Sequence, residues 1–261
     1  MRGFARALRE ADRTLIGTWV KIPSLETVEI LALSGFDYVV IDQEHAPLSF
    51  DFVYSATVVA QGAGMNVLVR VPDRSGSHLQ RLLDAGVDGI LVPRVTTAAE
   101  AAQSVAQMTF SPAGERGMGI TARAGQWGGL SRDAYLASGD DVLRAVQLED
   151  RGSLEAIAEI VAVPHLNGLF LGMGDLQQSS GLDEKDPQIQ RLVASFLEQA
   201  QAHRIPTGTA VQTAEQAAAA AARGFSFVMV SNDTGLLRAA AAGLVAETRS
   251  QVAERTQPQP A

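Results

Sequence analysis

Eight short apolar runs alternate with helix-like segments along the chain, and this alternation restricts the fold more than any other feature. Runs of this length are typical of parallel strands buried on both faces. Repeated strand–helix units imply a parallel sheet, and eight of them favour a closed (β/α)₈ TIM barrel, an α/β fold, over an open sheet. The runs are Leu15–Trp19, Tyr38–Ile41, Val67–Val71, Gly89–Val92, Ala145–Leu148, Gly168–Leu171, Thr207–Val211 and Phe225–Val230.

The segments between the runs carry helix start and stop signals. Ser24–Ser34 opens with a capping serine and ends at Gly35, and Ser77–Ala85 ends at Gly86. We expect one barrel domain over residues 1–255 and a flexible tail over 256–261. The other expected helices are Ala98–Met108, Ser153–Val161, Ile189–His203, Ala214–Arg223 and a C-terminal helix from Leu236 to about Val252.

Composition narrows the function classes. The net charge of −8 argues against nucleic-acid and membrane-surface partners, and the absence of cysteine excludes disulfides and thiolate chemistry. Residues 1–9 are basic and amphipathic but lack the apolar core of a signal peptide, so an exposed first helix explains them better. The cytoplasm is the default location.

Four polar residues stand at the ends of four different apolar runs: His45, Arg70, Glu149 and Asp175. The carboxyl ends of barrel strands carry the active site in this architecture. A base, a guanidinium and two carboxylates at these positions indicate an enzyme.

The two carboxylates are candidates for one metal site. Gln147 and Glu149 share a face of their strand, and Asp175 follows the next strand through the turn 172–174. Neighbouring strands lie about 4.8 Å apart, so both acids could bind one hard divalent cation. The alternatives are solvated loop acids, or Asp175 capping a short helix over Leu176–Ser179. The glycine turn could hold an anion or be a plain tight turn.

His45 and Arg70 each allow two interpretations. His45 could be a positioned base, oriented by Asp42 or by Asp84, or a structural loop residue. Arg70 could stabilise negative charge on a substrate oxygen, or form a structural ion pair with Glu44 or Asp42.

Lysine chemistry has little support. Only Lys21 and Lys185 are present, and Lys185 lies in an acidic loop. A Schiff-base aldolase needs a lysine inside the barrel, so Lys21 is the only candidate.

At these positions the chain resembles the metal-dependent pyruvate aldolases of the HpcH/HpaI family, over nearly its whole length. The resemblance implies a barrel of the phosphoenolpyruvate/pyruvate type that cleaves 4-hydroxy-2-oxo acids to pyruvate and an aldehyde. The matching stretches include Gly35-Phe36-Asp37, Glu44-His45-Ala46-Pro47, Leu82-Leu83-Asp84-Ala85-Gly86, Val146-Gln147-Leu148-Glu149, Gly172 to Leu176 and Asn232-Asp233-Thr234.

The resemblance also implies roles for individual residues. Divalent magnesium, manganese or cobalt would be bound by Glu149 and Asp175, with Gln147 beside them. Arg70 would stabilise the pyruvate enolate, and His45 would move the proton at the aldehyde oxygen. The other implied roles are support of the histidine, from Asp84 and Asp42, and the carboxylate cradle, at Gly172 and Gly174.

The aldehyde half of the substrate is less defined. Trp19, Arg123, Val211 and Gln212 are expected to line its pocket. Family members form hexamers in which a terminal helix packs on a neighbour, so the resemblance implies a homo-hexamer.

Two departures from the family pattern concern the site. Met173 stands where the family usually has proline, which would loosen the carboxylate cradle, and Asp150 replaces a Ser or Thr. Neither removes a catalytic group.

Two other functions remain open. Related barrels cleave acyl-CoA thioesters, although that activity needs a basic groove for the CoA phosphates. A sensor that binds 2-oxo acids could keep Arg70 and the cradle without needing His45.

Overall fold

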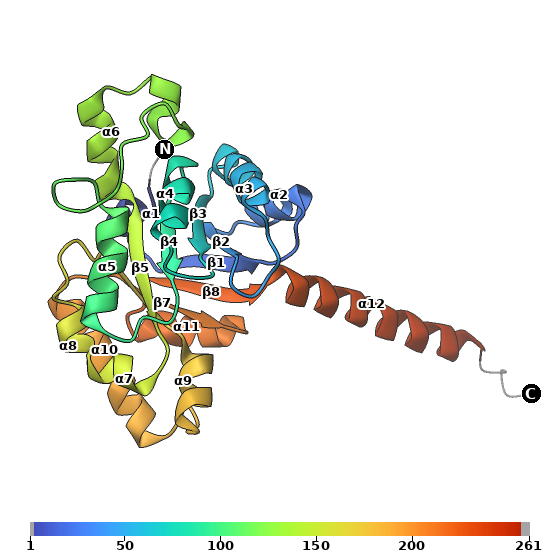
Figure 1. Cartoon of the computed structure of the whole chain (residues 1–261). Helices are drawn as coiled ribbons and strands as arrows, with labels where there is room; N and C mark the ends of the chain where they lie inside the picture. Colours follow the sequence, from blue (N-terminus) through green and yellow to red (C-terminus); the bar gives the residue numbers. More distant parts are fainter. Residues whose placement is uncertain (1–2, 257–261) are drawn as a thin grey trace, which may run out of the picture.

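Eight parallel strands close into one barrel in the computed structural model, which describes residues 3–256. The strands pair in chain order, and β1 pairs with β8 to complete the ring (Figure 1). The predicted (β/α)₈ barrel is therefore confirmed. The strands are β1 (Leu15–Val20), β2 (Tyr38–Asp42), β3 (Asn66–Arg70), β4 (Gly89–Val92), β5 (Leu143–Leu148), β6 (Gly168–Leu171), β7 (Thr207–Val211) and β8 (Phe227–Asn232).

The helices that lie between successive strands cover the outside of the barrel. The predicted helix Ser153–Val161 is broken at Ala156 into two short helices, and the helix Phe50–Gly62 was not predicted. The helices are α1 (Phe4–Glu10), α2 (Leu25–Leu33), α3 (Phe50–Gly62), α4 (Gly76–Asp84), α5 (Ala98–Met108), α6 (Arg132–Ser138), α7 (Arg151–Glu155), α8 (Ile157–Ile160), α9 (Met173–Ser180), α10 (Pro187–Ala202), α11 (Ala214–Ala222) and α12 (Asp233–Thr256), with short 3₁₀ turns η1 (Arg123–Gly128) and η2 (Gly139–Asp141).

Alternate strand residues form two separate cores. Val40, Leu68 and Phe170 point inward and fill the barrel, whereas their neighbours Val39 and Val67 pack against the helices. This alternation follows from the period of two in a strand. It also fixes which polar residues at the strand ends face the barrel mouth.

The first helix is not exposed, contrary to the prediction. Phe4 is completely buried and its ring lies 4.7 Å from Tyr38 and 5.7 Å from Phe227. Both partners belong to the inner core, so α1 closes the amino end of the barrel. The basic residues of this segment lie on the other side of an amphipathic helix.

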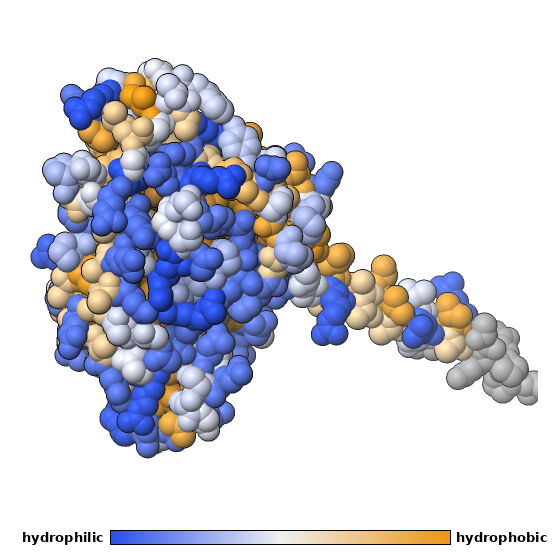
Figure 2. All heavy atoms as spheres, viewed as in Figure 1, coloured by the Kyte–Doolittle hydropathy of each residue, from blue (hydrophilic) through white to orange (hydrophobic). Residues whose placement is uncertain are grey.

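The last helix, α12, leaves the barrel and projects away from it (Figure 1). Its exposed apolar residues appear as orange spheres along the projection in Figure 2. Within residues 3–256, no helix has the length and apolarity that a membrane crossing requires. Of the predicted tail, residues 257–261 lie outside the described residues. The exposed apolar residues are Leu236, Leu237, Leu244, Val245 and Val252.

Asp88 at the amino end of the barrel makes stability depend on pH. It is 4% exposed and accepts hydrogen bonds from the Val67 N–H and the Gln61 amide, at 2.9 and 2.8 Å. Burial outweighs these bonds and raises its pKa to about 6. A raised native pKa means that the free energy of unfolding falls as pH rises from about 4 through 6.

We expect Asp88→Asn to remove most of this pH dependence. A pKa difference of about two units changes the free energy of unfolding by no more than about 3 kcal/mol. Urea denaturation at pH 4.5 and 7.5 measures it. The exposed Asp12→Asn is the control and should leave the slope unchanged. An unchanged slope in Asp88→Asn would contradict the assignment.

Candidate active site

Asp42 and Arg70 form the centre of the barrel mouth. They are register partners at the ends of β2 and β3, and both follow inward residues. The Arg70 Nε and Nη2 atoms donate to the two oxygens of Asp42 at 2.9 and 2.7 Å. Burial alone would raise the pKa of Asp42, but the bonds and charges of Arg70 and Lys21 lower it to about 2. Asp42 is therefore ionised at neutral pH.

The Trp19 ring stacks against the guanidinium group of Arg70. The Arg70 Cζ atom lies 4.1 Å from the Trp19 ring centroid, and the indole packs edge-on against Phe170. Such a stack fixes the plane of an arginine and stabilises its charge. Trp19 is buried, so the structure places it under Arg70 rather than on an open pocket wall.

His45 follows β2 with its side chain exposed at the mouth. Asp42 accepts a hydrogen bond from the backbone N–H of His45 at 3.2 Å, not from its imidazole. The nearest carboxylate to the ring is Glu44, whose Oε2 lies 3.5 Å from Nε2. Asp42 thus positions the loop that carries His45, and the expected contact with the ring is corrected to Glu44.

Asp84 lies at the other end of the barrel from His45. It ends α4, which starts after β3 and runs back to the amino end of β4. Its carboxylate contacts Arg116 at 3.5 Å and Tyr135 at 3.4 Å. Burial raises its pKa. Within one chain Asp84 cannot orient the histidine, so that expectation is wrong for a single subunit.

Arg123 also lies at the amino end, contrary to the prediction. Its guanidinium donates to the Ala85 carbonyl at 3.0 Å and to the Gln61 side chain at 2.7 Å. These bonds tie the 3₁₀ turn η1 to the turn after α4. Arg123 therefore does not line the aldehyde pocket of its own chain.

Val211 faces the helix layer rather than the barrel interior, whereas Gln212 follows Ala210 by two residues on the inward row of β7. Val211 packs against the outer core, while Ala210 belongs to the inner one. Gln212 donates its N–H to Gln216 of α11 at 2.9 Å. Both residues line a cavity of about 280 Å³ beside Met173 and α11, so the orientation expected for Val211 is corrected, and the place of Gln212 in the aldehyde pocket stays a prediction.

Glu149 is fixed beside the mouth by two donors. The Gln147 amide donates to Oε2, and the Arg94 N–H donates to Oε1 at 2.9 Å. Arg94 has a left-handed backbone with φ of 55°, which is uncommon outside glycine and is often retained for function. Burial, then the charges of Asp175 and Glu44, raise the pKa of Glu149. A bound cation would relieve this repulsion.

The surroundings of Glu149 fit a hard divalent cation. Gln147 Oε1 is a buried acceptor without a hydrogen-bond partner among the described residues, and Glu44 Oε2 has only ion-pair contacts, of which the shorter is to Arg70 Nη1 at 3.4 Å. Between residues 3 and 256, no cluster of three or more His, Cys, Asp or Glu side chains has metal-binding geometry. Two carboxylates, Glu149 and Asp175, would leave the other coordination positions to substrate oxygens and water.

The turn after β6 is the candidate anion-binding element. Gly172 precedes α9, and a Cβ there would lie 2.7 Å from the Glu149 Cβ, so only glycine fits without a shift. A Cβ on Gly174 would meet nothing within 4 Å, which leaves open space beside the first turn. The first N–H groups of a helix have no partner within the helix and attract anions. Met173 begins α9, so the helix forms without the family proline.

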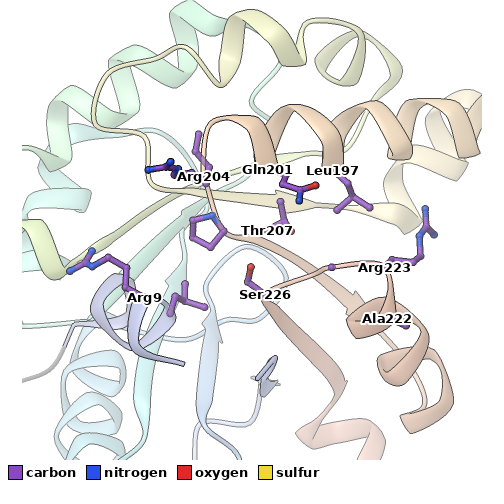
Figure 3. A pocket seen from close by; sticks show the side chains of 12 residues that line it. Arg9, Leu197, Gln201, Arg204, Thr207, Ala222, Arg223 and Ser226 are labelled. Carbon is purple, nitrogen blue, oxygen red and sulfur yellow. The ribbon is translucent and has the colours of Figure 1, made fainter. Parts of the chain in front are cut away.

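A second hollow, of about 530 Å³, lies at the amino ends of β7 and β8 (Figure 3). Arg9 and Arg204 lie on one side of it and Arg223 on the other, and their guanidinium groups do not converge (Figure 3). Arg9 is also paired with Asp141 at 2.7 Å. The candidate active site is therefore the cluster of polar residues at the carboxyl ends of the strands.

A buried arginine, Arg70, lies with the carboxylates of Asp42 and Glu149 at the mouth of an eight-stranded barrel. The chain belongs to the HpcH/HpaI aldolase/citrate lyase family, whose model matches residues 15–240. A 5-keto-4-deoxy-D-glucarate aldolase of Shigella dysenteriae is 31% identical over 237 residues, covering 90% of this chain and 92% of that protein.

Solved structures show the same relationship. An HpcH/HpaI aldolase/citrate lyase family protein from Burkholderia cenocepacia has a TM-score of 0.87 and 29% identity, covering 95% of this chain and all of that one. Protein CitE from Mycobacterium tuberculosis, in complex with magnesium and pyruvate, is 15% identical with a TM-score of 0.54 over 86% of this chain and 87% of its own; it shares the fold.

Sequence reasoning missed three residues of the mouth. Glu44 was considered as an ion-pair partner of Arg70, and the Arg70 Nη1 atom indeed lies 3.4 Å from its Oε2 atom, whereas Arg94 was not considered. Lys21 was weighed only as a Schiff-base lysine, yet its Nζ lies 2.6 Å from Asp42. The sequence could have placed Lys21 at the mouth, because it lies two residues beyond the inward Trp19 and therefore on the same face of the strand.

Proposed function

We propose that this chain is a metal-dependent pyruvate aldolase that reversibly cleaves 4-hydroxy-2-oxo acids to pyruvate and an aldehyde. The observation that carries the proposal is the Asp42–Arg70 pair at the same barrel mouth as Glu149. Glu149 and Asp175 would hold the cation, which could be magnesium, manganese or cobalt. When bound, the cation would polarise the 2-oxo group of the substrate.

The residues of the chain divide the remaining work. The N–H groups of the first turn of α9 bind the substrate carboxylate. His45 takes the proton of the C4 hydroxyl while the C3–C4 bond breaks, which releases the aldehyde. The electron pair moves to the enolate, whose oxygen Arg70 stabilises. A proton returned to C3 then completes pyruvate.

Pyruvate release from a racemic 4-hydroxy-2-oxo acid, coupled to lactate dehydrogenase, tests this activity. We expect release to stop after EDTA treatment and to return with magnesium, manganese or cobalt. Release that resists EDTA, together with borohydride trapping of Lys21, would favour a Schiff-base mechanism instead. No release under any condition would refute the aldolase.

Replacing His45 separates an enzyme from a sensor. General acid–base groups contribute about a hundredfold to ten-thousandfold. We expect His45→Ala to lose turnover on that scale while it keeps pyruvate affinity, because the side chain is exposed and the loop is held through its backbone. The exposed His203→Ala is the control. A His45→Ala protein with full turnover would exclude the proposed role.

The acyl-CoA lyase alternative is tested separately. Free CoA should give no thermal stabilisation at concentrations at which pyruvate does, because Arg70 and Arg94 at the mouth are already paired with Asp42 and Glu44. A CoA-dependent shift would support that alternative.

The projecting helix bears on assembly. We propose that the exposed apolar residues of α12, among them Leu237 and Leu244, pack on a neighbouring subunit of a homo-hexamer. Light scattering measures the mass, and a monomer at micromolar concentration would contradict the proposal.

A further inference from the structure

Lys21 is a second cation on the carboxylate that holds Arg70. Its Nζ lies 2.6 Å from the Asp42 Oδ2 atom, and the Arg70 Nη2 lies 2.7 Å from the same oxygen. Asp42 is completely buried, and the Lys21 side chain is 24% exposed. One buried anion is therefore shared by two cations, of which only the lysine reaches solvent.

This sharing changes the charge of the barrel mouth. A bidentate Asp42–Arg70 pair alone would be neutral. Lys21 adds one positive charge, and the Glu44 carboxylate is in turn balanced by Arg94, whose Nε lies 3.3 Å away. Together these five groups carry one surplus positive charge. The proposed metal ligands Glu149 and Asp175 add two negative charges at the same mouth, which a bound divalent cation would offset. Interactions of such charges are strong where water is largely excluded.

The backbone of Lys21 is fixed independently of its side chain. Asp233, at the start of α12, is 3% exposed and accepts the N–H groups of Lys21 and Ile22 at 2.9 and 2.8 Å. The inward row of β1 also leads from Trp19 to Lys21, so the ammonium lies on the side of Arg70. A substitution at Lys21 that spares this backbone should leave the loop in place.

We propose that Lys21 is a positioning residue that shares the Asp42 carboxylate with Arg70. Because Lys21 offsets part of the charge of Asp42, the positive charge of Arg70 stays available to a dianionic enolate. This inference rests on the proposed function and adds a residue to it. If the inference is right, neutralising Lys21 lowers the binding affinity for a dianion more than that for a monoanion. A merely structural lysine would weaken all ligands alike.

Calorimetric titration of the magnesium-loaded protein with oxalate, a planar dianion, and with pyruvate, a monoanion, tests this selectivity. We expect Lys21→Met to lower the affinity for oxalate about tenfold and the affinity for pyruvate less than about twofold. Lys21→Arg should restore oxalate binding. Lys185→Met removes the only other lysine, which lies in an exposed loop, and should change neither affinity.

A second measurement leaves Lys21 in place and does not depend on turnover. Reductive methylation with ¹³C-formaldehyde labels the two lysines and the terminal amine and keeps their charge, and Lys185→Arg assigns the two lysine signals. We expect oxalate to shift the Lys21 signal and to leave the Lys185 signal in place.

The outcomes separate the two proposals. Equal loss of oxalate and pyruvate in Lys21→Met, or a Lys21 signal that ignores oxalate, would overturn the role of Lys21. Absence of pyruvate release by the wild type, with oxalate selectivity intact, would refute the aldolase activity and support the charge arrangement.

Discussion

Replacing Glu149 by Gln should abolish metal-dependent pyruvate release. The substitution keeps the size of the side chain and an acceptor for the Arg94 N–H, but it removes one of two proposed anionic ligands. We expect metal affinity to fall at least about a hundredfold and pyruvate release about a thousandfold. Calorimetry with manganese and the coupled assay measure the two quantities.

Stability should move in the opposite direction. Burial and the neighbouring acids Asp175 and Glu44 raise the pKa of Glu149, so its ionised form is disfavoured in the metal-free fold. The metal-free Glu149→Gln protein should therefore be at least as stable as the wild type at neutral pH. Glu155→Gln on the surface of α7 is the matched control. Retained manganese binding in Glu149→Gln would refute the ligand assignment.

The strands were predictable because their signal is local. A short apolar run between a glycine stop and a polar end is readable without knowledge of its neighbours, and all eight predicted runs overlap observed strands. Helix α3 was missed although Ser49 caps it. The break at Ala156 also depends on packing, which a single run of sequence does not encode.

The errors in the site concern direction rather than residue type. Asp84 and Arg123 are polar residues near family motifs, but a helix that follows a strand returns the chain to the amino end of the barrel. The prediction for Val211 was wrong for a related reason, since the inward row of β7 contains its neighbour Ala210. The inward rows of β1 and β5, by contrast, bring Trp19, Gln147 and Glu149 to the carboxyl end of the barrel, where Trp19 stacks on Arg70 instead of lining an open pocket. Register along each strand predicts the mouth better than proximity in sequence does.

Replacing Arg70 by Met should have the second large effect, on both activity and stability. Loss of one donor to a developing oxyanion typically costs about a hundredfold to a thousandfold in turnover. The variant also leaves the buried Asp42 with Lys21 as its only charged partner. Breaking a buried ion pair costs about 3–5 kcal/mol, and the remaining lysine should keep the loss near the lower end.

The double variant Arg70→Met with Asp42→Asn separates the two effects. Neutralising Asp42 removes the uncompensated charge, so most of the lost stability should return in urea denaturation. Turnover should stay low, because the guanidinium that stacks on Trp19 at 4.1 Å is still missing. If turnover recovered together with stability, Arg70 would be a structural residue. If neither recovered, Asp42 would have a role beyond holding Arg70, which its bonds to the Glu44 and His45 N–H groups would then explain.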